Sequence, residues 1–373
     1  MTAILAILRE SWLSLRAEKL FKVVMGLNIL VIVGFASIGF DKTGVTIFFG
    51  LSHIESEFVF AGSPLARTLY MGIYSAFIVN IWLAWAASIL ALVSTSSIFP
   101  SFLSQGAVEL VLSRPTRRST IFLVKYCGGL LFVMLQVSVF TVGAFFAAGW
   151  RVGEWDPAIF LAIPLITLFY SYLFCINALA GTLTRSTLVA LLVTLLFWFS
   201  TFGIRTADDI LARFTLMFEA RVERLEKQVG NLELEVKAAE ADGDDVATKD
   251  AEHWLAEPED ELELAKRAIA QLAPWKTVIN GVRAITPETA RTIGLLHRAL
   301  ERDSDITLQQ LLSGEAFRDE NEPPRDLDDV EVAEQELVKR EENISPWLII
   351  GKSLIFEVVI LGIAMMIFRR RDY

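Results

Sequence analysis

The sequence predicts an all-α membrane protein with six transmembrane helices, an N-terminal interfacial helix and a large helical insert outside the membrane. Composition is the first observation, because 54% of the 373 residues are hydrophobic and the mean hydropathy is +0.49. Several apolar runs are the second, since roughly 20 apolar residues are needed for a helix to cross a bilayer. The formal net charge of −10 is the third, because it divides unevenly between a basic membrane part and an acidic insert.

Residues 1–22 are predicted to form an amphipathic helix that lies in the membrane interface. Charged residues such as Arg9, Glu10 and Arg16 are interleaved at helical spacing with an apolar face. A cleavable signal peptide is not expected, because its charges would precede one short apolar core. The apolar face consists of Ile4, Leu5, Ile7, Leu8, Trp12, Leu15 and Leu20.

Residues 23–204 are predicted to contain five spans, and residues 346–373 a sixth span with a basic tail. Between the first two spans, residues 41–69 are predicted to form an irregular loop, because glycines and Pro64 interrupt them. The predicted spans are 23–40, 71–99, 126–150, 158–183, 188–204 and 347–368.

The distribution of basic residues predicts which side of the membrane each loop occupies. Six spans place both termini on one side, and the loops on that side carry most of the Lys and Arg found outside the insert. The positive-inside rule therefore assigns both termini to the cytoplasm. Because five spans precede the insert, residues 205–345, it is then expected on the extracytoplasmic side. The short outer loops hold only Lys42, Arg67 and Arg151.

The insert is predicted to be a water-exposed helical module. It carries 18 Lys and Arg against 34 Asp and Glu, a net charge of −16. This sign argues against nucleic acid or anionic lipid as its direct ligand. A second helical stretch after Pro258 would return antiparallel to the first as a hairpin, and a last helix is expected over residues 327–342.

The first part of the insert has the spacing of a coiled coil. Apolar residues recur there in alternate steps of four and three, which predicts a helix that packs along its length on a partner helix. Three partners remain open: the returning stretch of the same chain, a second copy of the chain, or another extracytoplasmic protein. The seam consists of Phe218, Val222, Leu225, Val229, Leu232 and Val236.

A polar, positively charged loop, residues 100–125, separates the second and third spans. Within it a compact apolar group beside Glu109 predicts a short surface helix that Pro115 ends, because the residue before a proline is pushed out of the helical region. The positive-inside rule alone would explain the arginines of this loop. It would not explain Gly106, Glu109 and Pro115 together.

These residues resemble the loop that follows the second span in ABC type-2 permeases, the membrane subunits of ATP-driven exporters. The resemblance combines a glycine, an acidic residue, a Ser-Arg-Pro turn and a lysine at fixed offsets, while Ala107 departs from the hydroxyl residue or Asn that the family more often has. It is carried by Gln105, Gly106, Glu109, Leu110, Leu112, Ser113, Arg114, Pro115, Arg118, Lys125, Tyr126, Gly128 and Gly129. The ending Phe368 to Asp372 is also similar to the usual end of the family's chains.

The resemblance implies that this loop forms a coupling helix, which docks on a separate ATPase subunit. That subunit would bind ATP and Mg²⁺, and this chain would hold no cofactor. The resemblance further implies a bacterial cytoplasmic (inner) membrane location and a second permease copy, or a related permease, as partner. The ATPase-coupling residues would be Gln105, Gly106, Glu109, Leu110, Arg114, Pro115, Arg118 and Lys125.

Two polar residues inside predicted spans are candidates for a translocation path. Glu357 falls about midway through the sixth span, where a carboxylate is costly and often functional. Asn28 lies in the first span and can hydrogen-bond to a neighbouring helix. The alternative for Glu357 is structural, with its carboxyl group facing a cavity or paired with another span.

No metal site and no catalytic site are predicted. His53, Glu55 and Glu57 have strand-like spacing, but three mixed ligands without cysteine make a weak metal signature. There is no GxxxxGK[ST] phosphate-binding loop, and the three histidines do not assemble with a nucleophile and an acid. The chain is therefore not expected to be an enzyme.

Two functions follow as hypotheses. The first is the membrane-spanning permease subunit of an ATP-binding-cassette exporter, which works as a pair of permeases with ATPase partners in the lipid bilayer. The alternative is a membrane-anchored extracytoplasmic coiled-coil scaffold or binding protein without transport. The large insert favours considering the alternative, because ABC type-2 permeases usually have a short connection there.

Overall fold

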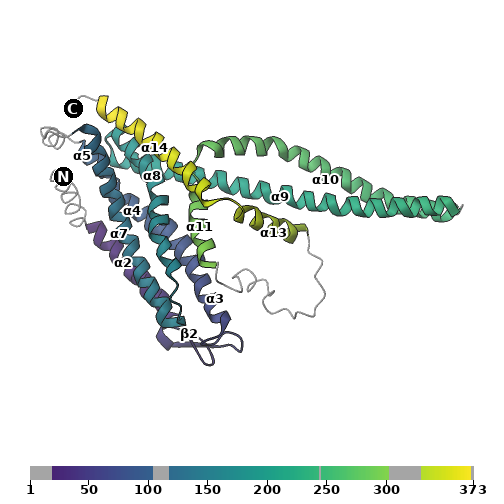
Figure 1. Ribbon diagram of the computed structural model, residues 1–373, viewed down its shortest axis with the longest axis horizontal. Coiled ribbons are helices and arrows are strands. Elements are labelled where there is room, and N and C mark those ends of the chain that lie inside the picture. The colour runs from purple at the N-terminus through teal and green to yellow at the C-terminus, as the bar shows by residue number, and fades with distance from the viewer. Residues whose placement is uncertain (1–18, 104–116, 243–244, 302–328, 371–373) are drawn as a thin grey trace. The chain divides into compact units, whose positions relative to one another are not determined.

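Figure 1 shows the computed structural model, which describes residues 19–103, 117–242, 245–301 and 329–370. The predicted interfacial helix lies outside these residues, except for the start of helix α2 (Lys19–Ser37). So do residues 104–116, which hold most of the predicted coupling residues.

Five helical segments of the described chain are long and apolar enough to cross a membrane. They coincide with the second to sixth predicted spans. The predicted first span corresponds to α2, whose apolar stretch Phe21–Ser37 is shorter. The five segments are Pro64–Phe102, Arg118–Val152, Pro157–Thr184, Thr187–Ala241 and Pro346–Arg370.

The first of these five segments begins earlier than predicted and contains an unusual helix. Ser63 caps its start by accepting a hydrogen bond from the Ala66 N–H at 3.1 Å, and Pro64 occupies the first helical position. The segment is built from α3 (Pro64–Ile73), a π-helical stretch η2 (Tyr74–Ala87), α4 (Ser88–Thr95) and α5 (Ile98–Phe102). Wide π-helical turns are rare and are frequently found at functional sites.

The remaining apolar helices are regular. Helix α7 (Arg118–Val152) ends at Gly153, whose φ of 72° is the left-handed conformation that glycine adopts most easily. A short 3₁₀ turn, η3 (Pro157–Leu161), leads into α8 (Ala162–Thr184). Helix α9 (Thr187–Asp242) is 56 residues long, and α14 (Pro346–Arg370) ends the described chain.

The prediction of an irregular loop after the first span is wrong for its first part. Residues there form a three-stranded antiparallel sheet of β1 (Gly39–Asp41), β2 (Gly44–Ile47) and β3 (Ser52–Glu55), with a 3₁₀ turn η1 (Phe48–Gly50) before β3. Val45 pairs with Phe40 on one side and Ile54 on the other. The β-branched Val-Thr-Ile run favours a strand, and the glycines act at its turns rather than abolishing it.

The described chain divides into two compact units. Unit 1 comprises residues 1–199, 287–321 and 346–373, and unit 2 comprises residues 200–286 and 322–345. The predicted insert is therefore divided differently from expectation, because α11 (Thr289–Glu301) groups with the apolar helices of unit 1. A wide buried face on α11 explains this placement, since it packs against α8, η3, α14 and η2. That face consists of Thr289, Thr292, Ile293, Leu295, Leu296 and Leu300.

Helix α8 lies at the centre of unit 1. It packs against α7, α14 and α11, and α2 packs on the other side of α7 (Figure 1). Gly129 allows the close approach of α7 and α8, because a β-carbon at this position would lie 2.6 Å from the ring of Phe174. Phe174 is fully buried and stacks with Tyr126 and Tyr170 at centroid distances of 5.2 and 5.7 Å.

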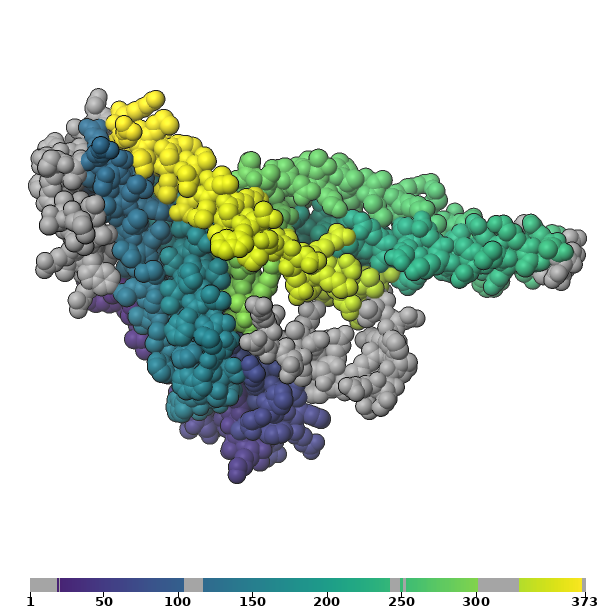
Figure 2. All heavy atoms as spheres, viewed as in Figure 1, coloured from purple at the N-terminus to yellow at the C-terminus, as the bar shows by residue number. Residues whose placement is uncertain are grey.

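Unit 2 is built from α9 from Ser200 onward, α10 (Asp245–Ile285) and α13 (Asp329–Glu342). Helices α9 and α10 run side by side (Figure 1), and their surfaces meet toward the turn that joins them (Figure 2). The predicted seam of α9 is its less exposed face, with Leu225 and Val229 buried. Ion pairs link α9 to α10, as in Arg221–Glu261 at 2.9 Å, and to α13, as in Arg213–Glu334 at 2.9 Å.

Candidate functional site

Glu357 is the centre of a buried polar cluster within unit 1. Its side chain is only 7% exposed, and it lies on the face of α14 that packs into the bundle. The Tyr126 hydroxyl of α7 donates to one carboxyl oxygen at 2.8 Å, and the Ser171 hydroxyl of α8 donates to the other at 2.8 Å. One carboxyl group thus connects three apolar helices.

The hydrogen count of this cluster favours a neutral carboxyl group. The Tyr126 hydroxyl also lies 2.9 Å from the Ser171 carbonyl, and the Ser171 hydroxyl lies 2.8 Å from the Leu168 carbonyl. Two hydroxyl hydrogens therefore face four acceptors, and a proton on Glu357 supplies a third hydrogen. Among the described residues no Lys or Arg forms an ion pair with Glu357, so no opposite charge offsets the cost of a buried negative charge.

A second polar cluster lies one turn away on α14 and holds the start of α11. Ser353, four residues before Glu357, accepts a hydrogen bond from the Glu288 N–H at 2.9 Å. The Lys352 ammonium group pairs with the Glu288 carboxylate at 2.6 Å, and Arg291 lies 3.6 Å from the same carboxylate. Lys352 therefore has a protein partner that the sequence did not suggest.

His297 fixes the middle of α11 to the π-helical stretch. Its Nδ1 contacts the Ser75 hydroxyl, and its Nε2 lies 3.0 Å from Asn80 Oδ1. A neutral imidazole with its proton on Nε2 satisfies both contacts, because the ring then accepts from Ser75 and donates to Asn80. Burial lowers the pKa of His297, which favours the same neutral form.

Asn28, the other predicted path residue, belongs to a separate contact. It is fully buried on α2, and its Oδ1 accepts from the Trp82 indole N–H of η2 at 2.9 Å. The structure therefore does not bring Asn28 and Glu357 into one cluster. Asn28 makes the helix-to-helix hydrogen bond that the sequence predicted for it.

Of the predicted coupling residues, Arg118 and Lys125 lie in the described chain. Arg118 begins α7, and its guanidinium group donates to the Arg369 carbonyl at the end of α14 at 3.2 Å. The Lys125 ammonium group lies over the Phe102 ring, 5.8 Å from its centroid. The end of α5, the first turns of α7 and the end of α14 thus lie together. The other six, Gln105, Gly106, Glu109, Leu110, Arg114 and Pro115, lie outside the described residues.

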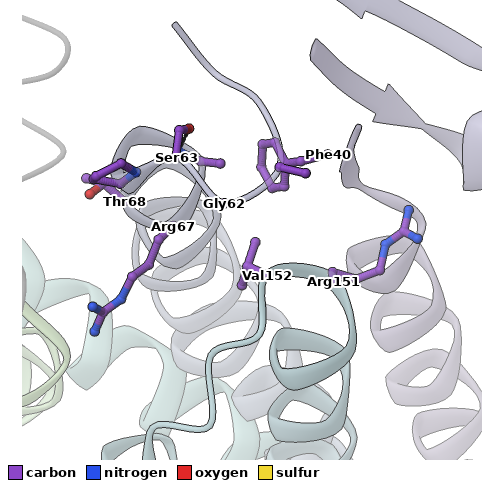
Figure 3. Close-up of a pocket in the computed structure, with 10 residues that line it drawn as sticks. Phe40, Gly62, Ser63, Arg67, Thr68, Arg151 and Val152 are labelled. Carbon is purple, nitrogen blue, oxygen red and sulfur yellow. Dashed lines mark hydrogen bonds between the residues drawn. The ribbon is translucent and has the colours of Figure 1, made fainter. Parts of the chain in front are cut away.

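A cavity of about 300 Å³ opens where the sheet, the start of α3 and the end of α7 meet. Figure 3 shows two arginines in its wall, whose guanidinium groups extend in opposite directions. Arg67 pairs with Glu154 at 2.7 Å, and Arg151 donates to the Ile38 carbonyl at 2.8 Å. Because both side chains already have protein partners, these arginines tie the neighbouring loops to the helices rather than forming an anion site.

The candidate metal ligands do not converge. His53 Nε2 lies 3.0 Å from the Thr43 hydroxyl across the β2–β3 pair. Within the described ranges, no group of three His, Cys, Asp or Glu side chains is arranged to hold a metal ion.

These features define a mainly helical protein with several helices able to span a membrane. The chain belongs to the family described as protein of unknown function DUF2705, whose model matches residues 19–215. The match extends from α2 into α9, and it leaves out most of unit 2 as well as α11 and α14. Neither the curated proteins nor the solved structures gave a match.

Proposed function

We propose that this chain is the membrane-spanning permease subunit of an ATP-binding-cassette exporter. The observation that carries the proposal is the similarity of residues 105–129 to the loop after the second span of ABC type-2 permeases. Five long apolar helices support the membrane assignment. In this proposal α2 is the first of six spans, both termini are cytoplasmic, and unit 2 is an extracytoplasmic coiled-coil domain.

The contacts around the loop support a mechanical role for its neighbours. Arg118 links the start of α7 to the last turn of α14, and Lys125 lies over Phe102 of α5. A movement of the loop would therefore be passed to three helices at once. Through α7 and α14 it would reach the Glu357 cluster, which joins the same two helices to α8.

The working unit in this proposal contains two permeases, either two copies or one copy with a related chain, and two ATPase subunits. Six spans are half of the twelve usual in exporters that this chain resembles, so the translocation path would lie between two halves. ATP and Mg²⁺ would be bound by the partner ATPase, and this chain would carry out no chemistry itself.

A second candidate function is a membrane-anchored scaffold without transport. Unit 2 favours it, because its three helices are joined by several ion pairs and leave a large exposed surface. In that case the apolar helices would only hold unit 2 at the membrane, and no ATPase partner would be needed.

Purification of the tagged chain in a mild detergent separates the two candidates. The permease proposal predicts that a nucleotide-binding subunit is recovered, and that the mass of the complex corresponds to two permeases and two ATPases. A double variant, Glu109→Ala with Arg118→Ala, should lose the ATPase while remaining monodisperse. Arg213→Ala is the matched control, because it removes an arginine of unit 2 that pairs with Glu334.

Recovery of the same ATPase with the double variant would argue against docking through this loop. A wild-type preparation without any nucleotide-binding protein, from cells that produce the folded chain, would favour the scaffold.

A further inference from the structure

The π-helical stretch η2 in the second predicted span is long for its type. It covers 14 residues, Tyr74–Ala87, whereas most π-helices are single turns inserted into α-helices. The α-helical segments α3 and α4 directly precede and follow it in the same span. Side chains from elsewhere in the fold must therefore favour the wider turn, because the α-helix is the ordinary conformation of an apolar span.

The buried face of η2 follows the spacing of a π-helix. Each π-helical turn closes from residue i to residue i+5, so side chains five positions apart share one side. Tyr74, Val79 and Ala84 have this spacing, and all three are buried. In an α-helix, successive members of such a series would lie about 140° apart around the axis and could not share one face.

The end of η2 has a hydrogen bond that matches this geometry. The Ser88 hydroxyl donates to the Leu83 carbonyl, five residues back, at 2.9 Å. Further along α4, Ser94 and Thr95 instead donate to carbonyls four residues back. The side chain at the C-terminal boundary of η2 is thus satisfied in the π-helical form.

His297 of α11 bridges one turn of η2. Its ring joins the Ser75 hydroxyl to the Asn80 side chain, with Nε2 3.0 Å from Asn80 Oδ1. Ser75 and Asn80 are five residues apart, so one imidazole reaches both only where residues i and i+5 face the same way. An α-helical turn would carry one of them about 140° around the axis and would break one of the two contacts.

Contacts that do not involve η2 hold His297 in place. Helix α11 also packs on α8, η3 and α14. Just before α11 begins, the Glu288 carboxylate pairs with the Lys352 ammonium group of α14 at 2.6 Å. Leu296, the neighbour of His297, is fully buried. The bridging ring is therefore presented to η2 by a helix that the rest of unit 1 fixes.

We propose that His297 is a positioning residue that keeps residues 75–80 in π-helical form, so that the docking of α11 sets the rotation of the second predicted span. Without this bridge the turn becomes α-helical. Because an α-helical turn holds fewer residues, α4 and α5 then rotate about the axis of the span. Helix α5 ends at Phe102, below the Lys125 ammonium group. The bridge thus connects α11 to the end of α5, whichever function the chain has.

Bridging of cysteine pairs by dibromobimane, which fluoresces after it reacts with two neighbouring thiols, tests the proposal on the full chain in detergent. Cys127→Ala and Cys175→Ala would first remove the two native thiols. The pair Ala76→Cys with Ile81→Cys spans five residues and shares one side only in a π-helix. The pair Ile78→Cys with Ile81→Cys spans three residues and shares one side only in an α-helix.

Each pair would be measured with His297 present, with His297→Leu and with His297→Gln, which keeps a side chain able to bond to both partners. His253→Leu is the matched control, because it removes an exposed histidine of unit 2. Asn80→Leu breaks the same bridge from the side of η2 and replaces His297→Leu if that variant does not fold.

With His297, His297→Gln or His253→Leu, the 76–81 pair should be bridged and the 78–81 pair should not. His297→Leu and Asn80→Leu should reverse the ratio of the two signals. Bridging of the 78–81 pair while His297 is present, or an unchanged ratio in both His297→Leu and Asn80→Leu, would overturn the proposal. A reversal in His297→Gln as large as in His297→Leu would also overturn it, because the hydrogen bonds would then not hold the turn.

Discussion

At the scale of single residues, Glu357 is a buried carboxyl group that is hydrogen-bonded to two neighbouring helices. We expect Glu357→Gln to retain the thermal stability of the wild type. The amide oxygen can accept from one of the two hydroxyl groups, and the amide NH₂ can donate to the oxygen of the other, whose hydrogen then goes to its backbone carbonyl. Glu357→Ala should lower the stability by about 1–3 kcal/mol, because it removes these hydrogen bonds inside the bundle. Thermal unfolding in one detergent compares the three proteins.

Infrared spectroscopy provides a direct control for the protonation state of Glu357. The wild type should show a protonated carboxyl band that Glu357→Gln lacks. If the Gln variant were destabilised as much as the Ala variant, the side chain would be a required carboxylate and the neutral assignment would be wrong.

His297 should make the stability of the protein depend on pH. Its pKa in the folded chain is lowered by burial, so the unfolded chain takes up a proton at a higher pH than the folded chain does. The contribution of His297 to stability is therefore complete above the ordinary histidine pKa of about 6.5 and declines as the pH falls below it.

His297→Gln removes this titration while keeping a side chain that can bond to Ser75 and Asn80. Melting temperatures at about pH 5.5 and 7.5 should fall further on acidification for the wild type than for the variant. Equal falls would mean that His297 is not held neutral, because all other titratable groups are shared by the two proteins.

The sequence predicted that some of these polar side chains are buried, but it did not predict which residues they contact. The apolar surroundings of Glu357 and Asn28 marked both as buried polar groups, and the structure bears this out. Tyr126 and Ser171 were not predicted, because nothing in a sequence of apolar helices sets their relative rotation. His297 was missed for a different reason: it was assigned to a water-exposed insert, although its neighbours Ile293, Leu296 and Leu300 have helical spacing.

At the scale of elements, the contact between α7 and α8 depends on a missing side chain. Gly129→Ala should destabilise the protein by about 1–3 kcal/mol, because the new β-carbon would meet the fixed ring of Phe174. Gly362→Ala on α14 is the control, since a β-carbon there has no atom within 4 Å. Equal melting temperatures for the two variants would show that α7 and α8 can separate without cost.

The apolar helices were predictable as elements, because hydrophobic length alone identifies them. The small sheet was not predicted, since Gly44 and Gly50 were given more weight than the Val-Thr-Ile strand between them. The predicted seam of α9 does correspond to its less exposed face, because heptad spacing directly describes one side of a helix. What the spacing could not provide is the partner, which in the structure includes α10 and α13.

At the scale of the whole molecule, the domain boundaries predicted from the sequence differ from those of the two compact units in the structure. Net charge grouped residues 205–345 together, whereas packing assigns α11 to the apolar helices of unit 1. A charge total cannot detect a short amphipathic helix, because its charged residues are counted with those of its surroundings.

We propose that the loop of residues 100–125 contacts an ATPase on the cytoplasmic side, while unit 2 lies on the other side of the membrane. A photo-cross-linking amino acid placed at Glu109 in living cells tests contact and sidedness together, and the same amino acid at Glu233 of α9 is the control. We predict that the adduct at position 109 contains a nucleotide-binding subunit and that the adduct at position 233 does not. An ATPase adduct at position 233, or none at position 109 in a folded, membrane-inserted chain, would contradict the account.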